Sequence, residues 1–303
     1  MSRPQRARRC QLSVPGSSKK MMEKSAGLEC DHVFLDLEDA VAPHLKAEAR
    51  GMIVEALNRH TWKPKTLSVR INDVETEYCH DDIIEVVTGA GEKLDTIILT
   101  KAKNAHDVMF VHRLLDQLEK KLSLKNRIGI ECLIEEVEGM MNVEDIASCS
   151  DRLESLIFGM GDYSASQAMN IENIGGDSTN YPPDLWHYPR YKLTIACRAN
   201  GLDPVDGPTA DFRNQDFFQA ECERGNVLGM VGKWAIHPSQ IVIAQAVFSP
   251  SVNAVETARK QQQAYNDARA QGLGAIQVDG VMVDAASMRI LQNTLDKAKL
   301  FGM

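Results

Sequence analysis

The 303-residue chain lacks the features that mark several protein classes. No apolar run is long enough to span a membrane, so we expect no transmembrane segment. The formal net charge of −8 is spread along the chain, and the lack of a concentrated basic face argues against nucleic-acid binding. No Cys-x-x-Cys pair occurs, and no Cys/His pair has the spacing of a zinc site.

The cysteines are odd in number and scattered, which is not the pattern of a disulfide framework. The seven are Cys10, Cys30, Cys79, Cys132, Cys149, Cys197 and Cys222. We expect reduced, mostly buried thiols in a cytosolic protein. The only basic cluster, Arg3, Arg6, Arg8 and Arg9, has no apolar segment of a signal peptide. It is either a solvated N-terminal arm or a subsite for an anionic ligand such as a nucleotide phosphate.

What the chain does contain is a regular series of short β-branched runs. Hydrophobic residues make up 44% and charged residues 25%, as in ordinary soluble globular proteins. Eight runs predict strands at 10–14, 32–37, 66–71, 96–101, 127–134, 154–159, 202–207 and 227–236.

The stretches between these runs have helical periodicity. Apolar residues recur every three or four positions in segments such as 44–59 and 105–122. Eight strand–helix units favour an α/β fold with a closed (β/α)8 TIM barrel. A doubly wound open sheet is the alternative, and it is less favoured because "VPGSSKK", without a GxGxxG pattern, follows the first strand.

The end of the chain lies outside this eightfold pattern. After "FSPSV" (248–252) come a Gln/Ala/Arg-rich helix, a glycine-containing turn, the segment "AIQVDGVMVDA" and a final helix. We therefore expect a barrel domain over 1–247 and a C-terminal segment over 248–303. That segment is either a packing helix pair or a lid over the barrel mouth.

Charged residues follow nearly every expected strand. A single carboxylate at a strand end usually caps the next helix, but so many strand ends with charged groups favour a site at the barrel mouth. These residues are Asp36, Glu38, Asp39, Arg70, Lys101, Glu135, Asp162, Asp206, Lys233 and His237.

Several carboxylates at one mouth predict a cation that neutralises them. Oxygen ligands favour Mg²⁺ or Mn²⁺. Arg70 suits a substrate carboxylate, since its planar group makes bidentate bonds; the alternative is a buried pair with Asp36 or Glu38. Either Glu135 or Glu136 should face the site, and periodicity does not choose between them. Glu138, Glu144 and Asp145 are expected on a helix surface.

At these positions the chain resembles the citrate lyase beta-subunit-like (HpcH/HpaI aldolase) family, and most closely its malyl-coenzyme A lyase branch. The stretches that carry the resemblance run in order over about residues 9–290. They are "RCQLSVPGS", "VFLDLEDAVAP", "KAEAR", "VRIN", "LIE" with "GMMNVEDIA", "FGMGDYSAS", "IGG", "ACRANGLDPVDGP", "GKWAIHPSQI" and "VDGVMVDAASMR".

The resemblance implies a TIM barrel with a C-terminal lid, assembled as a homotrimer or homohexamer. It implies Mg²⁺ held by the Glu of "LIE" and the Asp of "GDYSAS", here Glu135 and Asp162, which selects Glu135 over its neighbour. Arg70 matches the arginine that holds the carboxylate of the oxo acid. Glu38 and Asp39 match residues that support the metal waters and Arg70.

The lid aspartate of the family matches Asp284, which would reach a neighbouring subunit's site as the acid/base for a thioester enolate. Partial burial there should raise its pKa. Arg8, Arg9 and Lys19 would meet coenzyme A phosphates, helped by the helix N-terminus after "PGSS", and His237 is expected to contact substrate. Two departures from the family, "LTK" for "IPK" and "IEE" for "IET", bear on substrate choice more than on reaction class.

The activity expected from the resemblance is reversible Claisen-type cleavage of L-malyl-coenzyme A to glyoxylate and acetyl-coenzyme A, with a methylated analogue giving propionyl-coenzyme A. Three alternatives remain: cleavage of citramalyl-coenzyme A to pyruvate, a malyl-coenzyme A thioesterase, and a non-catalytic lyase subunit that binds an acyl carrier. The last predicts a missing metal ligand or lid aspartate, and both are present.

Overall fold

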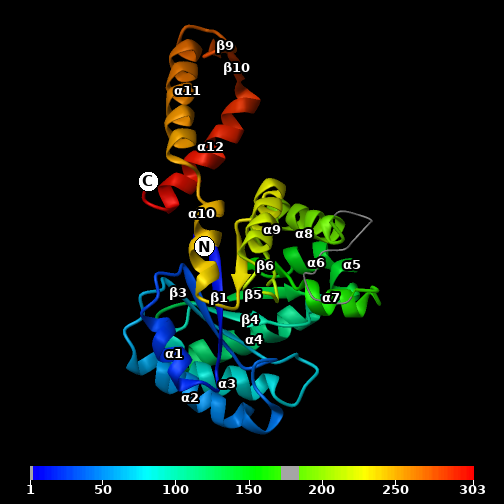
Figure 1. Ribbon diagram of the computed structural model, residues 1–303. Coiled ribbons are helices and arrows are strands. Elements are labelled where there is room, and N and C mark those ends of the chain that lie inside the picture. The colour runs from blue at the N-terminus through cyan, green and yellow to red at the C-terminus, as the bar shows by residue number, and fades with distance from the viewer. Residues whose placement is uncertain (1–2, 172–183) are drawn as a thin grey trace.

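Eight parallel strands close into a barrel in the computed structural model, which describes residues 3–171 and 184–303. Neighbouring strands pair in sequence order, and β1 also pairs with β8 to close the ring. The strands are β1 (Cys10–Pro15), β2 (His32–Asp36), β3 (Thr66–Arg70), β4 (Thr96–Leu99), β5 (Gly129–Ile134), β6 (Leu153–Phe158), β7 (Asp203–Asp206) and β8 (Gly232–Ala235). The TIM-barrel prediction is confirmed, and the open-sheet alternative is wrong (Figure 1).

One strand prediction was too long. The run at 227–236 was expected to be a single strand, but helix α9 (Gln215–Leu228) includes its first two residues and only Gly232–Ala235 forms β8. The chain turns between them at Gly229, whose φ of 95° is a conformation that favours glycine. The apolar residues before this turn are the end of an amphipathic helix, which a short apolar run does not distinguish from a strand.

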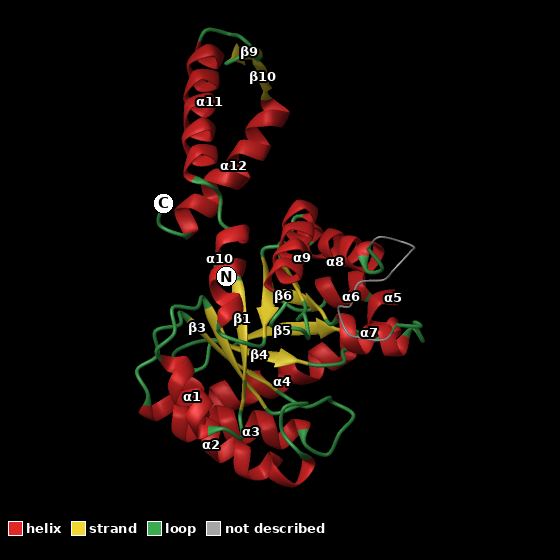
Figure 2. Ribbon diagram, in the orientation of Figure 1, coloured by secondary structure: helices red, strands yellow, loops and turns green. Residues whose placement is uncertain are grey.

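Helices connect the strands and surround the barrel. The segments 44–59 and 105–122 form α2 and α4, close to their expected bounds. Figure 2 shows the helices outside the ring of strands. Those of the barrel are α1 (Lys19–Ala26), α2 (Lys46–Arg59), α3 (Cys79–Ala90), α4 (Ala105–Leu122), α5 (Val137–Met141), α6 (Val143–Ser148), α7 (Met160–Ser166), α8 (His187–Ala199), α9 (Gln215–Leu228) and α10 (Ser239–Phe248), with short 3-10 turns at Pro43–Leu45 and Gly91–Lys93.

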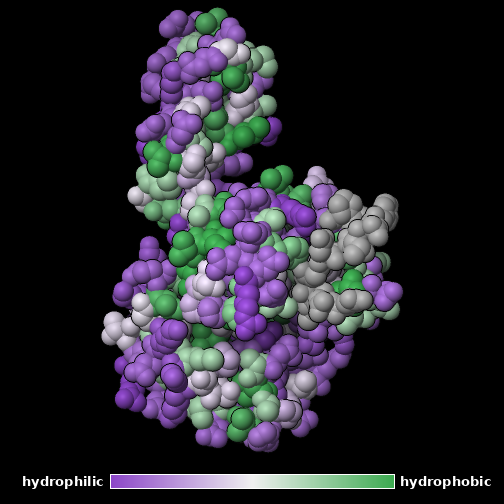
Figure 3. Space-filling model, viewed as in Figure 1, coloured by the Kyte–Doolittle hydropathy of each residue, from purple (hydrophilic) through white to green (hydrophobic). Residues whose placement is uncertain are grey.

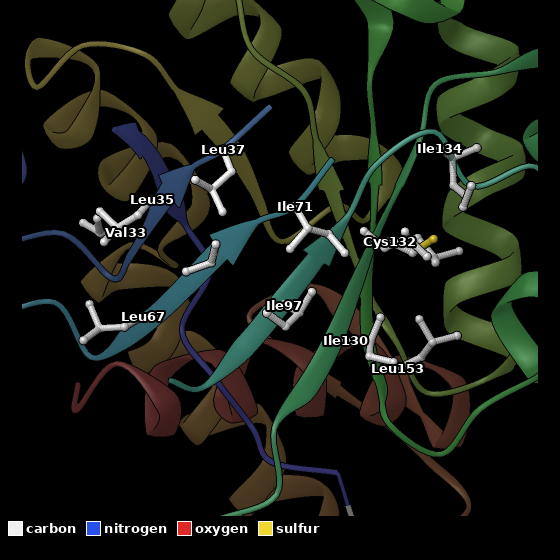
Figure 4. Close-up of a cluster of buried hydrophobic side chains, with 14 of the residues drawn as sticks. Val33, Leu35, Leu37, Leu67, Ile71, Ile97, Ile130, Cys132, Ile134 and Leu153 are labelled. Atoms are coloured by element: carbon white, nitrogen blue, oxygen red, sulfur yellow. The ribbon is translucent and has the colours of Figure 1, made fainter. Parts of the chain in front are cut away.

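The main core lies between the strands and these helices. Alternate strand residues such as Leu35, Leu67, Ile97 and Ile130 point outward into it, as Figure 4 shows. A smaller apolar cluster from six strands fills the barrel interior and includes Phe34 and Trp234. All seven cysteines are free, and six are buried, as expected for reduced thiols. No helix of the described residues is both long and apolar enough to cross a membrane.

The C-terminal segment extends away from the barrel as an arm (Figure 1). It consists of α11 (Val252–Ala270), the antiparallel hairpin of β9 (Ala275–Val278) and β10 (Val281–Asp284), and α12 (Ala285–Leu300). The hairpin packs on α11 through its own small core of Tyr265, Val278 and Val283. Figure 3 shows apolar side chains on the surface of this arm, where Met282 and Ile290 are exposed.

The base of the arm packs at the end of the barrel where the strands begin. Phe301, just after α12, lies under the guanidinium of Arg9, which precedes β1, with 4.1 Å from Cζ to the ring centroid. A 16-residue helix then separates this base from the hairpin by roughly 24 Å. The arm therefore does not cover the mouth of its own barrel.

Candidate active site

The ends of β2 and β3 place an arginine among acids. Asp36 and Arg70 are directly paired residues in the two strands. Arg70 donates from Nε and Nη2 to the two carboxylate oxygens of Asp36 at 2.7 and 2.6 Å, and its Nη1 lies 2.8 Å from Glu38 Oε2. Its guanidinium also lies over the ring of Trp234, 5.5 Å from the centroid. Arg70 therefore forms ion pairs with both Asp36 and Glu38, yet at least two of its five N–H groups remain for a ligand.

Asp36 binds Arg70 and also orders the loop that follows β2. It is completely buried and accepts hydrogen bonds from the backbone N–H groups of Glu38 and Ala40 at 2.9 and 3.1 Å. The loop after β2 therefore bends around the Asp36 carboxylate and turns the Glu38 side chain toward the mouth. Asp39 faces solvent, with 65% of its side chain exposed, and its carboxylate is 3.7 Å from Arg70 Nη1.

Glu135 follows β5 and is 3% exposed, whereas its neighbour Glu136 is half-buried at the start of α5. Gly159, after β6, leaves the space that this side chain occupies. A Cβ on Gly159 would come within 2.6 Å of Glu135 Cβ and 2.7 Å of its Oε2. Asp162 lies in the first turn of α7, three residues further on. Glu138, Glu144 and Asp145 are exposed, as expected.

Lys101, after β4, joins the acids of these different strands. Its Nζ lies 2.5 Å from Glu38 Oε1, 3.4 Å from Asp162 Oδ2 and 3.8 Å from Glu135 Oε1. The sequence pattern places Lys101 at a strand end but predicts no role for it. Its signal was the departure from apolar character immediately after "TIILT".

The cluster has a surplus of negative charge. Asp36, Glu38, Glu135 and Asp162 would carry four negative charges if all were ionised, and Arg70 and Lys101 carry two positive charges. Burial raises the pKa of Glu135 well above its ordinary range, and the neighbouring Glu38 carboxylate raises it further. Burial likewise raises the pKa of Glu38. One divalent cation would balance the remaining two charges.

Glu135 and Asp162 fit such a cation. Both offer carboxylate oxygens at the mouth. The Glu135 side chain is buried, and 44% of the Asp162 side chain is exposed to solvent. The described residues contain no group of three or more His, Cys, Asp or Glu side chains arranged around one metal position. Mg²⁺ commonly uses only one or two protein carboxylates and keeps several waters, so two ligands are sufficient.

Asp206, the last residue of β7, and Lys233 neutralise each other; Lys233 is the second residue of β8 and does not lie at the strand end where it was expected. Asp206 and Lys233 are both completely buried, with 2.5 Å between the Lys233 Nζ and an Asp206 oxygen. Arg190 from α8 donates to both carboxylate oxygens of Asp206 and also pairs with Glu221. These residues join β7, β8 and two helices. His237, after β8, is exposed at the mouth and stacks on Phe212 at 4.6 Å.

The N-terminal arginines are neither solvated nor near the mouth. Arg8 is fully buried where the strands begin, with Nη2 at 2.6 Å from Glu154, Nη1 at 2.8 Å from Asp203 and Nε at 3.4 Å from Glu131. Arg9 pairs with Asp31 at 2.6 Å at the same end. The expectation that these two arginines bind coenzyme A phosphates is corrected, because the barrel lies between them and the mouth.

The same end of the barrel holds Arg6 and Arg3. Arg6 bridges Asp95 and Glu154, at 2.6 and 2.8 Å, and Arg3 donates to the carbonyl oxygen of Asn200 at 2.6 Å. Both interpretations of the basic cluster were therefore wrong. Its charges close the barrel through ion pairs that are distant in sequence.

Lys19 lies at the opposite end of the barrel from these arginines, which is the end that forms the mouth. It begins α1 directly after β1, is 62% exposed and pairs with Glu55 at 2.7 Å. Ser18 caps this helix by accepting from the backbone N–H of Met21. The helix after "PGSS" thus exists as expected, with Lys19 in its first turn.

Asp284 is far from the cluster of its own chain, since it lies in the hairpin of the arm. It caps α12 by accepting from the backbone N–H and the hydroxyl of Ser287 at 2.8 and 2.9 Å. Hydrogen bonds from Ser287 lower its pKa, opposite to the expected increase. The motif "IGG" (174–176) lies outside the described residues.

Comparisons with known proteins identify the family to which the chain belongs. A protein-family model described as HpcH/HpaI aldolase/citrate lyase matches residues 9–238. An L-malyl-CoA/beta-methylmalyl-CoA lyase of Cereibacter sphaeroides is 40% identical over 308 aligned positions, which cover 99% of this chain and 97% of that protein. A (3S)-malyl-CoA thioesterase of the same species is 33% identical and covers 95% of this chain and 93% of its own.

A solved structure shares the fold. The citrate lyase beta subunit of M. tuberculosis, complexed with oxaloacetate and magnesium, superimposes with a TM-score of 0.66 at 25% identity, covering 80% of this chain and 98% of that one. The family model spans the barrel from the residue before β1 to the loop after β8, and so includes every residue of the acidic cluster. The chain belongs to the HpcH/HpaI aldolase/citrate lyase family.

Proposed function

We propose that this protein is a Mg²⁺-dependent carbon–carbon lyase, with Mn²⁺ as a substitute, that reversibly cleaves L-malyl-coenzyme A to glyoxylate and acetyl-coenzyme A. Beta-methylmalyl-coenzyme A is proposed as a second substrate, giving propionyl-coenzyme A. The observation that carries the proposal is the cluster of Glu135, Asp162, Glu38 and Arg70 at the barrel mouth. The lyase relative at 40% identity supports the choice of thioester.

Glu135 and Asp162 would hold the metal, and a bound Mg²⁺ would supply Lewis-acid polarisation of the oxygens of the oxo acid. Arg70 would bind the carboxylate of the oxo acid through its remaining N–H groups. Asp36 and Glu38 fix the plane of the guanidinium, so the carboxylate is held in one orientation. Asp39 and His237, both exposed at this end, would border the entering substrate.

Cleavage requires a proton at the carbon that leaves. The 2-hydroxyl loses its proton to solvent at the open mouth, its oxygen becomes the aldehyde carbonyl, and the electron pair of the broken carbon–carbon bond passes to the thioester as an enolate. Asp284 would protonate this enolate carbon, and it would remove the same proton in the condensing direction. Because Asp284 lies in the outward-projecting arm, it would act in the site of a neighbouring subunit, within a homotrimer or homohexamer.

Lys19 and the N-terminus of α1 are proposed to bind coenzyme A phosphates. The side chain is exposed at the mouth end, and a helix N-terminus favours anions. Arg8 and Arg9 have no part in this proposal.

The test is an assay of the purified protein with Mg²⁺ and L-malyl-coenzyme A. Glyoxylate and acetyl-coenzyme A should appear in equal amounts, and Glu135→Ala and Asp162→Ala should abolish both products while the circular dichroism spectrum is retained. Glu136→Ala is the matched control, since its carboxylate is adjacent in sequence but is not among the acids of the cluster. This variant should keep wild-type activity.

The identity of the products separates this proposal from its alternatives. Release of malate and free coenzyme A would indicate a thioesterase. Cleavage of citramalyl-coenzyme A to pyruvate, with no reaction of malyl-coenzyme A, would reassign the substrate. Near wild-type activity of both alanine variants in Mg²⁺ would contradict the proposed metal site.

A further inference from the structure

Lys101 makes an unusual set of contacts for a residue that has no part in the proposed reaction. Its ammonium lies within 4 Å of three carboxylates, Glu38, Asp162 and Glu135. These acids follow three different strands, β2, β5 and β6, and two of them are the proposed metal ligands. A lysine at a helix surface normally meets one partner along its own helix.

The backbone conformation of Lys101 directs its side chain toward these carboxylates. Its φ of 51° is in the left-handed region, which costs free energy for a residue with a Cβ. The backbone N–H of Lys101 donates to Glu135 Oε1 at 3.0 Å. The same strained turn therefore anchors the Glu135 carboxylate and directs the Lys101 side chain into the cluster.

The ammonium and a magnesium ion would compete for the same oxygens. Mg²⁺ binds oxygen at about 2.1 Å, and two positive charges a few ångströms apart repel strongly in a partly buried site. The ammonium would have to withdraw from Asp162 and Glu135 for an ion to bind both. The ammonium would remain beside Glu38, because Glu38 is the nearest of the three acids and is not a proposed metal ligand.

We propose that Lys101 is an internal counter-ion of the metal site, which holds the carboxylates together before Mg²⁺ binds and lowers the affinity for Mg²⁺ by competing for them. This inference rests on the proposed assignment of Glu135 and Asp162 as metal ligands. It assigns Lys101 a positioning role that needs no contact with substrate.

The experiment is a calorimetric titration of the full-length protein with MgCl₂, together with thermal unfolding with and without Mg²⁺. Lys101→Met should bind Mg²⁺ at least about tenfold more tightly than the wild type, because a competing charge is removed. Its Tm without Mg²⁺ should fall, and its rise in Tm on adding Mg²⁺ should be larger. If Lys101→Met does not fold without metal, Lys101→Gln provides the same comparison with a polar side chain.

Two control variants isolate the charge. Lys103→Met removes a lysine two residues away, whose Nζ pairs with Glu75 at 2.7 Å outside the cluster, and should leave Mg²⁺ affinity unchanged. Lys101→Arg keeps the charge and should not tighten binding. An unchanged or weaker affinity in Lys101→Met, with wild-type protein that does bind Mg²⁺, would overturn this inference alone. No binding by the wild type would overturn the proposed metal site as well.

Discussion

Arg70 combines two roles that are usually treated as alternatives. Its pairs with Asp36 and Glu38 make it part of the barrel structure, and the same pairs orient the N–H groups that remain for a ligand. Burial by itself lowers the pKa of Arg70, but the nearby carboxylates, Asp36 first and then Glu38 and Glu135, together raise it above its ordinary value, so the group stays charged at any pH of interest.

We expect Arg70→Lys to impair the enzyme although it keeps the charge. A single ammonium cannot bind Asp36 in a bidentate manner and also present a planar pair of donors to a carboxylate. The KM for glyoxylate in the condensing direction should rise about tenfold or more, with a smaller change for acetyl-coenzyme A. Unchanged kinetic constants for glyoxylate would leave Arg70 with a structural role only.

His32 is a second residue whose chemistry follows from its position, here in the barrel interior. It is completely buried, its Nε2 is 2.6 Å from Ser68 Oγ, and its Nδ1 has no hydrogen-bond partner. Burial lowers the pKa of His32 to about 4. Since the unfolded-state value is near 6.5, the unfolded chain binds a proton between these two values that the folded chain does not.

This difference predicts a loss of stability on acidification. The free energy of unfolding contributed by His32 should be fully present above pH 6.5 and fall by roughly 3 kcal/mol as the pH decreases to 4. Urea unfolding of the wild type and His32→Gln at several pH values measures it. The variant should show a shallower decrease over this window, and identical pH profiles would contradict the buried, neutral state of His32.

At the scale of elements, the segment before β1 closes the barrel with ion pairs. Arg8 faces the buried Glu131 and Glu154 and the partly exposed Asp203, which belong to β5, β6 and β7. Burial by itself raises the pKa of Glu131, but the Arg8 charge and the hydrogen bonds from Ser155 and Gln11 together lower it to about 2. This network is tightly packed, since a Cβ on Gly232 would meet the Arg8 carbonyl oxygen at 1.7 Å.

Arg8 and Lys19 therefore provide a test of which basic residue binds coenzyme A. Arg8→Gln should lower the free energy of unfolding by about 3–5 kcal/mol, because it leaves the fully buried Glu131 without its cationic partner, and should not change the KM for the thioester. Lys19→Gln should leave stability almost unchanged and raise that KM. The opposite result, with stability kept and KM raised in Arg8→Gln, would restore the phosphate-binding interpretation of the N-terminal cluster.

At the scale of the whole molecule, the arm determines how a catalytic site would be completed. Its base is fixed to the end of the barrel where strands begin, through Arg9 and Phe301, and Asp284 lies at its far end. The cluster of Glu135 and Asp162 opens at the opposite end. The apolar side chains exposed near the hairpin, including Val281 and Met282, are suited to contact with a second subunit.

The Asp284→Asn variant separates capping from catalysis. Asparagine caps helices as well as aspartate, so thermal stability and Mg²⁺ affinity should remain while turnover falls by at least about a hundredfold. Mixing Asp284→Asn with Arg70→Ala subunits should restore part of the activity, since some sites then contain both wild-type residues. Full activity of Asp284→Asn alone would reduce the residue to a cap, and no recovery on mixing would contradict a lid shared between subunits.

The sequence by itself determined the eight strand–helix units and the chemistry at the strand ends. Strand composition and helical periodicity are local properties, so they were sufficient for the barrel and for the strand-end placement of Glu135 and Arg70. The eighth strand was predicted too long, and the cause is also local: the apolar end of a helix before Gly229 has the composition of a strand. Because all eight strands are parallel, their C-terminal ends lie together at one mouth of the barrel.

Only the tertiary structure decided which charged residues remain for a ligand. Asp206 and Glu135 are both strand-end acids, but Asp206 is neutralised by Lys233 and Arg190. Arg8 and Lys19 each carry one positive charge, but Arg8 is buried and paired with acids such as Asp203, 195 residues away in the sequence, whereas Lys19 is 62% exposed. The sequence could not reveal these pairings, because the charge that compensates a group depends on distances through space between segments that only the closed barrel brings together.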